Sequence, residues 1–161
     1  EGNAKSAGEV EQSWEQIKQK EKDGNKSVLA GVPDALPALI KCYRIQDKAR
    51  NVGFDWKEKE DIWHKVEEEL NEFKDEVHAM NQEKMEEEFG DLLFSMINAA
   101  RLYKINPENA LERCNRKFIR RFNHIEKRTK EENKELSQLS LEEMDAYWDE
   151  AKRIERENIQ S

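Results

Sequence analysis

Residues 65–94 read KVEEELNEFKDEVHAMNQEKMEEEFGDLLF, and this stretch decides the fold. Apolar residues recur in it every three or four positions, which is the spacing of one helix face. Residues 79–82 have the composition of a tight turn. The stretch therefore predicts two helices, over about 57–78 and 83–103, folded back on each other. The residues expected to face inward are Ile62, Val66, Leu70, Phe73 and Val77 on the first helix, and Phe89, Leu92, Leu93, Met96, Ile97 and Ala100 on the second.

Two acidic pairs lie on these helices, and the members of each pair are three positions apart, so they share a helix face. The pairs are Glu69 with Glu72 and Glu88 with Asp91. If the hairpin turns about Asn81, a rise of about 1.5 Å per residue puts the two pairs at nearly the same height. Two charges about 5 Å apart repel by roughly 3 kcal/mol at an effective dielectric near 20. Four facing carboxylates therefore need a cation, and an all-oxygen set favours Mg²⁺ or Mn²⁺ over zinc.

The alternative is that these acids, together with Glu68 and the run Glu86–Glu88, form only the solvated face of Glu-rich helices. Two observations favour a metal site instead. Asp91 is followed directly by Leu92-Leu93-Phe94, so it lies at the edge of an apolar helix face. Gly90 is a poor helix former whose presence permits close approach of another group. Both interpretations remain open at the level of sequence.

A basic run, Arg116-Lys117-Phe118-Ile119-Arg120-Arg121-Phe122, lies on a later predicted helix. Lys117 and Arg121 are four residues apart and share a face, and Phe118 and Phe122 anchor the helix. Cations beside an acidic metal cluster are what a polyphosphate requires, because the metal and the basic side chains bind different oxygens. The alternative is that these cations only pair with surface acids.

The composition favours an all-α fold, a helical bundle of about four to five main helices. The chain has 161 residues, of which 40% are charged and only six are Gly and three Pro. Further helices are predicted from Asp34 as N-cap, from Asn106-Pro107, and from the capping box Ser140-Leu141-Glu142-Glu143. Residues 1–28 are polar and predict a short helix and a linker, ahead of a domain over 29–161.

The charge and hydropathy exclude several classes of function. A net charge of −8 argues against a nucleic-acid-binding surface, which needs a basic patch. The sequence contains no apolar run of the length that a membrane span requires and no secretory leader. We therefore expect no nucleic-acid partner, no membrane association and a cytoplasmic location.

Five segments in this order resemble the MazG-type nucleoside triphosphate pyrophosphohydrolases of the all-α NTP pyrophosphatase superfamily. The resemblance covers about residues 29–155. Its segments are Leu36-Pro37-Ala38-Leu39, Val52-Gly53-Phe54-Asp55-Trp56, Lys65-Val66-Glu67-Glu68-Glu69, Glu88-Phe89-Gly90-Asp91-Leu92-Leu93-Phe94 and Asn115-Arg116-Lys117-Phe118-Ile119-Arg120-Arg121-Phe122.

The resemblance implies Mg²⁺-dependent hydrolysis of a nucleoside triphosphate to nucleoside monophosphate and pyrophosphate, with Mn²⁺ as a substitute metal. It also implies a homodimer that completes the bundle, and a polar N-terminal segment like the linker after a first tandem domain, so that this chain is the C-terminal part of a longer protein. The implied metal ligands are Glu69, Glu72, Glu88 and Asp91, with Glu68 holding or orienting a metal-bound water. The implied substrate contacts are Lys117 and Arg121 on the triphosphate, Lys65, Lys84 and Arg120 as weaker candidates, and Trp148 near the base.

Two alternatives remain. The chain could be a helical regulatory or interaction module with a degenerate site. It could also be a related pyrophosphohydrolase that is specific for dUTP, dCTP or a phosphoribosyl nucleotide. The sequence ranks neither bases nor sugars, because pocket shape decides that choice.

Overall fold

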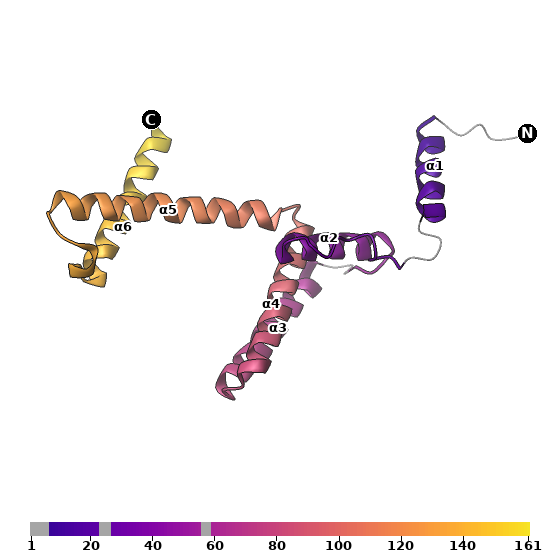
Figure 1. The fold of residues 1–161 in the computed structure, drawn as a ribbon, viewed down its shortest axis with the longest axis horizontal. Helices are drawn as coiled ribbons and strands as arrows, with labels where there is room; N and C mark the ends of the chain where they lie inside the picture. Colours follow the sequence, from indigo (N-terminus) through magenta and orange to yellow (C-terminus); the bar gives the residue numbers. More distant parts are fainter. Residues whose placement is uncertain (1–6, 23–26, 56–58) are drawn as a thin grey trace, which may run out of the picture. The chain divides into compact units, whose positions relative to one another are not determined.

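The computed structural model describes residues 7–22, 27–55 and 59–161, and all regular secondary structure in them is helical (Figure 1). This confirms the all-α prediction, whereas Trp56 lies outside the described residues. The chain divides into two compact units, one ending at Lys104 and one running from Ile105 to Ser161. The helices are α1 Ala7–Lys22, α2 Ala38–Asn51, α3 Lys59–His78, α4 Gln82–Leu102, α5 Pro107–Glu131 and α6 Leu141–Gln160, with a 3-10 turn at Leu136–Gln138.

The start of α2 differs from the sequence prediction. Asp34 was expected to cap this helix, but α2 begins at Ala38 and its N-cap position is Pro37, which makes no side-chain capping bond. The residue before a proline is disfavoured in the helical region of backbone conformation, so the chain at Leu36 cannot already be helical. Asp34 instead offers its backbone carbonyl oxygen to the ammonium group of Lys41, at 2.6 Å.

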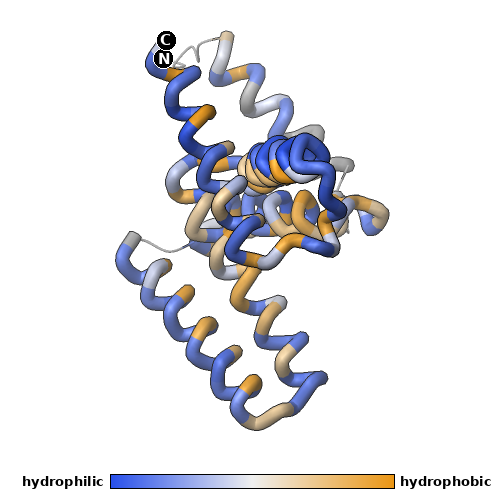
Figure 2. The backbone as a smooth tube through the Cα atoms, turned by 90° about the vertical axis from the view of Figure 1, so that its left-hand side faces the viewer, coloured by the Kyte–Doolittle hydropathy of each residue, from blue (hydrophilic) through white to orange (hydrophobic). Residues whose placement is uncertain are grey.

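The turn between α3 and α4 sets the register of the hairpin. Met80 adopts a left-handed backbone with φ of 54°, and the Asn81 amide donates to the Glu76 carbonyl at 3.3 Å, which closes the end of α3. The side chain of Asn81 then accepts a bond from the Lys84 amide at 3.2 Å and caps α4. This confirms the predicted tight turn. Figure 2 shows the two helices of the hairpin side by side, each with hydrophilic and hydrophobic residues interspersed along it.

The first unit has a small core, and several side chains predicted to face inward are exposed. Ile62, Leu92, Ile97 and Ala99 are buried where α3 packs on α4 and α2 packs on α4. Among the described residues of this unit, α3 and α2 make the main contacts with α4, and part of the apolar surface of α4 is exposed. The exposed apolar residues of the hairpin are Trp63, Leu70 and Val77 on α3 and Phe89, Leu93, Phe94 and Met96 on α4, each 36–49% exposed.

In the second unit, α6 folds back and packs across α5 (Figure 1). Asn106 caps α5 by accepting from the Asn109 amide at 3.1 Å. Ser140 and Glu143 form the predicted capping box at the start of α6. The buried residues of this unit are Ile125, Thr129, Leu139 and Ala151. Among the described helices of the whole chain, none has the length and apolar character of a membrane span.

Candidate metal centre

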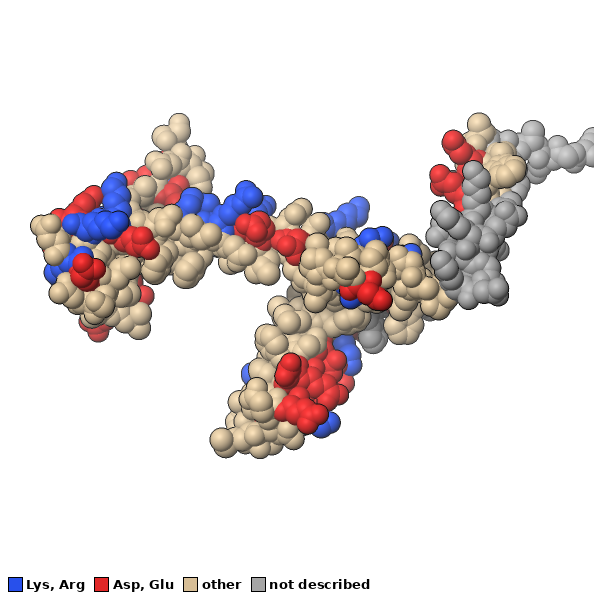
Figure 3. Space-filling model, in the orientation of Figure 1, with Lys and Arg blue, Asp and Glu red and all other residues tan. Residues whose placement is uncertain are grey.

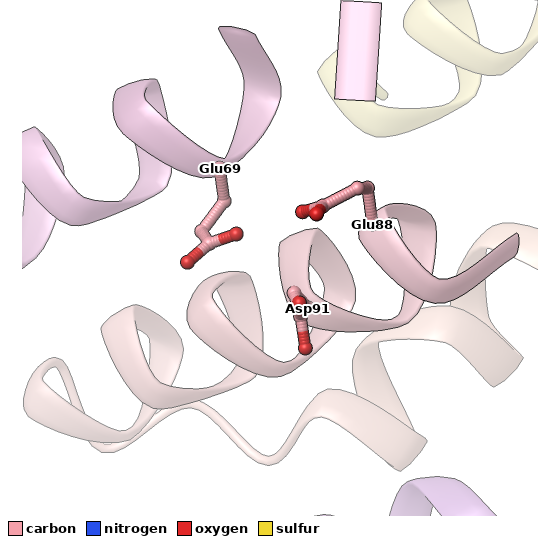
Figure 4. Close-up of side chains that lie close together, drawn as sticks. All are labelled: Glu69, Glu88 and Asp91. Atoms are coloured by element: carbon pink, nitrogen blue, oxygen red, sulfur yellow. The ribbon is translucent and has the colours of Figure 1, made fainter. Parts of the chain in front are cut away.

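Three carboxylates converge where α3 faces α4. Glu69 comes from α3 and Glu88 and Asp91 from α4, and one oxygen from each lies within 4.8 Å of the others. Figure 4 shows Glu69 and Glu88 pointing toward one another between the two helices, with Asp91 one turn beyond Glu88 on α4. The hairpin register therefore brings together residues 19 and 22 positions apart in sequence, as the matched heights of the two pairs predicted.

Two oxygens in this cluster are buried and lack a partner. Glu69 is only 7% exposed. Within the described residues, Oε2 of Glu69 and Oε2 of Glu88 have no hydrogen-bond donor. A buried carboxylate oxygen without a partner is costly, and an oxygen-binding divalent cation relieves that cost. The donor set therefore fits a divalent cation that prefers oxygen ligands.

Glu72, the fourth predicted ligand, lies beside the cluster and not within the close group of three. Its side chain is exposed. The negative charge of Glu69, followed by desolvation and the charge of Glu88, raises the pKa of Glu72 above its usual range. Glu72 lies about one turn further along α3 than Glu69, at the edge of this negative region.

Lys65 partly neutralises the cluster. Its Nζ lies 2.8 Å from Oε1 of Glu69 and 3.7 Å from Oε1 of Glu68. The hydrogen bond to Glu69 is the main cause of a raised pKa for Lys65, which therefore stays protonated. Glu69 thus has one oxygen paired with an ammonium group and one left over. Lys84, another predicted substrate contact, pairs instead with Glu87 at 3.6 Å.

A pocket of about 610 Å³ opens beside the cluster, between α2, α3 and α4, and is called the α2–α4 pocket below. Glu69 and Asp91 line it, and so does Arg101, which is 5% exposed. Nη2 of Arg101 donates to Asp55 at 2.9 Å and to Asn98 at 3.0 Å. The sequence analysis did not identify Arg101 as a site residue. The available signal was a single arginine directly after Ala99-Ala100 on an apolar helix, a position where a charged side chain needs a partner.

The predicted phosphate and base contacts of the second unit lie on α5 and α6. Lys117 and Arg120 are exposed on α5. Arg121 is engaged already, because it donates to Glu155 through Nη2 at 3.0 Å and Nε at 3.3 Å. Its guanidinium also lies 5.3 Å from the ring centre of Trp148. Figure 3 shows acidic side chains gathered on the visible side of the α3–α4 arm and basic ones along α5.

The structure places the protein in a general class: all-α proteins that carry a cluster of carboxylates on a helical hairpin. Residues 57–126 match the model of the MazG nucleotide pyrophosphohydrolase domain, a range that contains the whole acidic cluster. This match agrees with the resemblance to the MazG-type enzymes found in the sequence.

Curated relatives extend the match over most of the chain. It is 43% identical over 148 residues to a Thermotoga maritima protein named nucleoside triphosphate pyrophosphohydrolase/pyrophosphatase MazG, covering 91% of this chain and 57% of that protein. It is 39% identical over 157 residues to the Escherichia coli nucleoside triphosphate pyrophosphohydrolase, covering 95% and 60% respectively. It is 50% identical over 146 residues to the uncharacterized protein YabN of Bacillus subtilis, covering 89% and 30%. The chain therefore spans about three fifths of the length of the first two relatives.

Proposed function

We propose that the chain hydrolyses nucleoside triphosphates between the α and β phosphorus atoms, giving a nucleoside monophosphate and pyrophosphate, with Mg²⁺ or Mn²⁺ as cofactor. The observation that carries the proposal is the pair of buried, unpartnered oxygens of Glu69 and Glu88 beside Asp91. The match to the MazG domain and the names of two relatives support the same activity.

Glu69, Glu88 and Asp91 would hold the metal, with Glu72 as a further ligand from the exposed side. A divalent cation there would supply Lewis-acid neutralisation of charge on the phosphoryl oxygens. Glu68, next to Glu69 and 58% exposed at its side chain, would hold and orient the attacking water. The Lys65 ammonium group lies in contact with Glu69 and would donate to a phosphate oxygen at the edge of the cluster.

Lys117 and Arg121 remain the proposed contacts to the leaving pyrophosphate, with Lys84 and Arg120 as weaker candidates. Lys117 and Arg120 present exposed cations on α5, which supports this role. Arg121 would have to exchange Glu155 for a phosphate oxygen, since both Nε and Nη2 are bound to that carboxylate. Trp148 remains a candidate for contact with the base. Its ring packs 5.2 Å from that of Phe118, which also explains it as a structural residue.

We also propose that two copies of the chain associate. The exposed apolar residues of the hairpin support this, because soluble domains rarely leave many large apolar side chains uncovered along one pair of helices. Light scattering coupled to size-exclusion chromatography tests it: Leu93→Glu should shift a dimer to a monomer. Ile159→Glu, at an exposed position near the C-terminus, is the matched control.

The alternative function is a helical interaction module with a degenerate site. A panel of ribo- and deoxyribonucleoside triphosphates, assayed for pyrophosphate release with Mg²⁺ and with EDTA, decides between the two. We expect Mg²⁺-dependent release, lost in Glu69→Gln and Asp91→Asn while circular dichroism remains helical. Glu157→Gln, an exposed acid on α6, should keep full activity. Release of no pyrophosphate from any substrate would favour the interaction module, and full activity in both hairpin variants would exclude these residues from the site.

A further inference from the structure

The α2–α4 pocket extends along α4 away from the acidic cluster. Asp91 lines it beside the cluster, and Asn98 and Arg101 line it further along the same helix. Asp91 and Arg101 are ten residues apart, which corresponds to about 15 Å of helix. A nucleoside attached to a phosphate at the cluster would therefore have room along this part of the pocket.

The lining of this pocket is mostly apolar. Ile45 and Ala49 come from α2, Phe54 from the following loop and Phe94 from α4. A volume of about 610 Å³ lies within the range of small-molecule sites, which combine an apolar lining with a few polar groups that fix orientation. A flat heteroaromatic ring suits these walls better than a sugar or a phosphate does.

Three polar atoms of the lining residues are buried and have no hydrogen-bond partner among the described residues: Oε1 of Gln46, and Nε and Nη1 of Arg101. Gln46 is 4% exposed, and its Nε2 donates to the Phe94 carbonyl at 2.8 Å, which turns Oε1 away from that carbonyl. Because buried polar groups are normally paired, these two donors and one acceptor, on residues that line the pocket, point to a ligand that supplies complementary atoms.

If the proposed pyrophosphohydrolase function holds, we propose that this pocket binds the base of the nucleotide and that Arg101 and Gln46 recognise it. Arg101 donates to an exocyclic carbonyl oxygen, and Oε1 of Gln46 accepts from an N–H group of the same base. Guanine, cytosine, uracil and thymine each carry an exocyclic carbonyl, whereas adenine has none. Adenine nucleotides are therefore the poorest substrates of the site.

The first test compares kcat/KM for ATP with the values for GTP, CTP and UTP, using the full chain with Mg²⁺. We expect ATP to be poorer by at least about tenfold, since a site built to bond a substrate oxygen rejects the analogue lacking it. Arg101→Lys keeps a positive charge opposite Asp55 but lacks the guanidinium donors, and it should bring the ATP value closer to the others. Equal values for all four substrates in the unmodified protein would overturn the role of Arg101.

A second variant tests the pocket without disturbing a buried residue. Phe54 is 83% exposed and lines the pocket, so Phe54→Ala should leave the fold intact and raise KM for every nucleotide. Ile159→Ala, at a residue 84% exposed in the second unit, is the matched control and should change nothing. An unchanged KM in Phe54→Ala would place the base elsewhere, for example against Trp148.

A binding measurement separates this proposal from the proposed reaction. Isothermal titration of the full chain with GMP, UMP and AMP, without catalysis, should show AMP as the weakest ligand. The difference should shrink in Arg101→Lys. If these results hold but no triphosphate is hydrolysed, the pocket assignment stands and the reaction fails. Equal affinities, or no binding by any of the three, would overturn the pocket assignment.

Discussion

The acidic side chains of the two units differ in how fully basic side chains pair with them. On α6, Glu155 is bound by Arg121, and Glu150 lies 2.9 Å from His124 and 3.2 Å from Arg128. On the α3–α4 hairpin, three carboxylates approach one another, and within the described residues two of their buried oxygens have no donor. Paired acids hold two helices together, whereas acids that face one another with unpartnered oxygens carry a cost that Lys65 offsets only in part and that a bound cation would reduce. The contrast separates structural charge from the charge of the candidate site.

The largest expected effect is that of a divalent cation on the hairpin. Millimolar Mg²⁺ should raise the melting temperature of the metal-free chain, because an ion at about 100 times its dissociation constant stabilises the folded state by about 2.7 kcal/mol. Asp91→Asn should abolish the increase, and Glu155→Gln should retain it. Calorimetric scans with and without Mg²⁺ measure both, and an equal increase in Asp91→Asn would remove Asp91 from the metal centre.

A smaller effect is expected at the α5–α6 pairing. Glu155→Gln should lower the free energy of unfolding by about 1 kcal/mol, a value between those for exposed and buried ion pairs. The reason is that Arg121, 15% exposed at its side chain, loses a charged partner that binds two of its nitrogens. Urea titrations compare it with Glu157→Gln, an exposed acid on the same helix, which should have no effect. An equal loss in the two variants would contradict the structural role of this pair.

Acidification should affect the two units in opposite directions. Arg121 lowers the pKa of Glu155, so this pairing stabilises the fold above the usual glutamate value of about 4.3 and is lost as the pH falls through the lowered pKa. The charge of Glu69 raises the pKa of Glu72, so the hairpin gains stability as the pH falls through that raised value and Glu72 takes up a proton. Hydrogen-exchange protection factors of the metal-free chain, corrected for intrinsic rates, should rise in α3–α4 at mildly acidic pH and fall in α5–α6 only at lower pH. A parallel change in both units would contradict this difference.

The smallest effect is expected for Glu72→Gln. The substitution removes a charge that is repelled by Glu69 and Glu88, so the metal-free chain should melt slightly higher than the parent. The stabilisation by Mg²⁺ should weaken but persist, because Glu72 lies outside the close group of three. Glu76→Gln, one turn further along α3, is the control. A lower melting temperature in metal-free Glu72→Gln would show that Glu72 makes a stabilising contact.

Local patterns explain why much of the fold was predictable. Asn81, Asn106 and Ser140 each cap the helix that was expected to follow them, since these side chains satisfy amides at the start of a helix whatever surrounds it. The same regularity predicted that the acidic residues of α3 and α4 would lie close together, because a hairpin with one short turn leaves little freedom in register. Asp34 failed as a cap for a local reason as well, the proline at position 37.

Contacts between distant residues were not predictable. Arg101 and Asp55 are 46 positions apart, and Arg121 and Glu155 are 34 apart, so no periodicity links them. The sequence likewise offered no sign that Gln46 would be buried. It also gave no sign that Leu93 and Met96 would stay exposed, because the broad apolar face of their helix predicts a central position in the bundle. Burial depends on which elements cover a face, and that information lies in other parts of the chain.

The amino-acid order alone determined the helices, the caps of α4, α5 and α6, and the height at which Glu69, Glu88 and Asp91 meet, because helix rise and turn length are local properties of the backbone. Tertiary packing decided which of the charged groups remain unpaired. It paired Arg121 and enclosed Arg101 beside a pocket, because the environment of a side chain is set by elements that lie far from it in sequence.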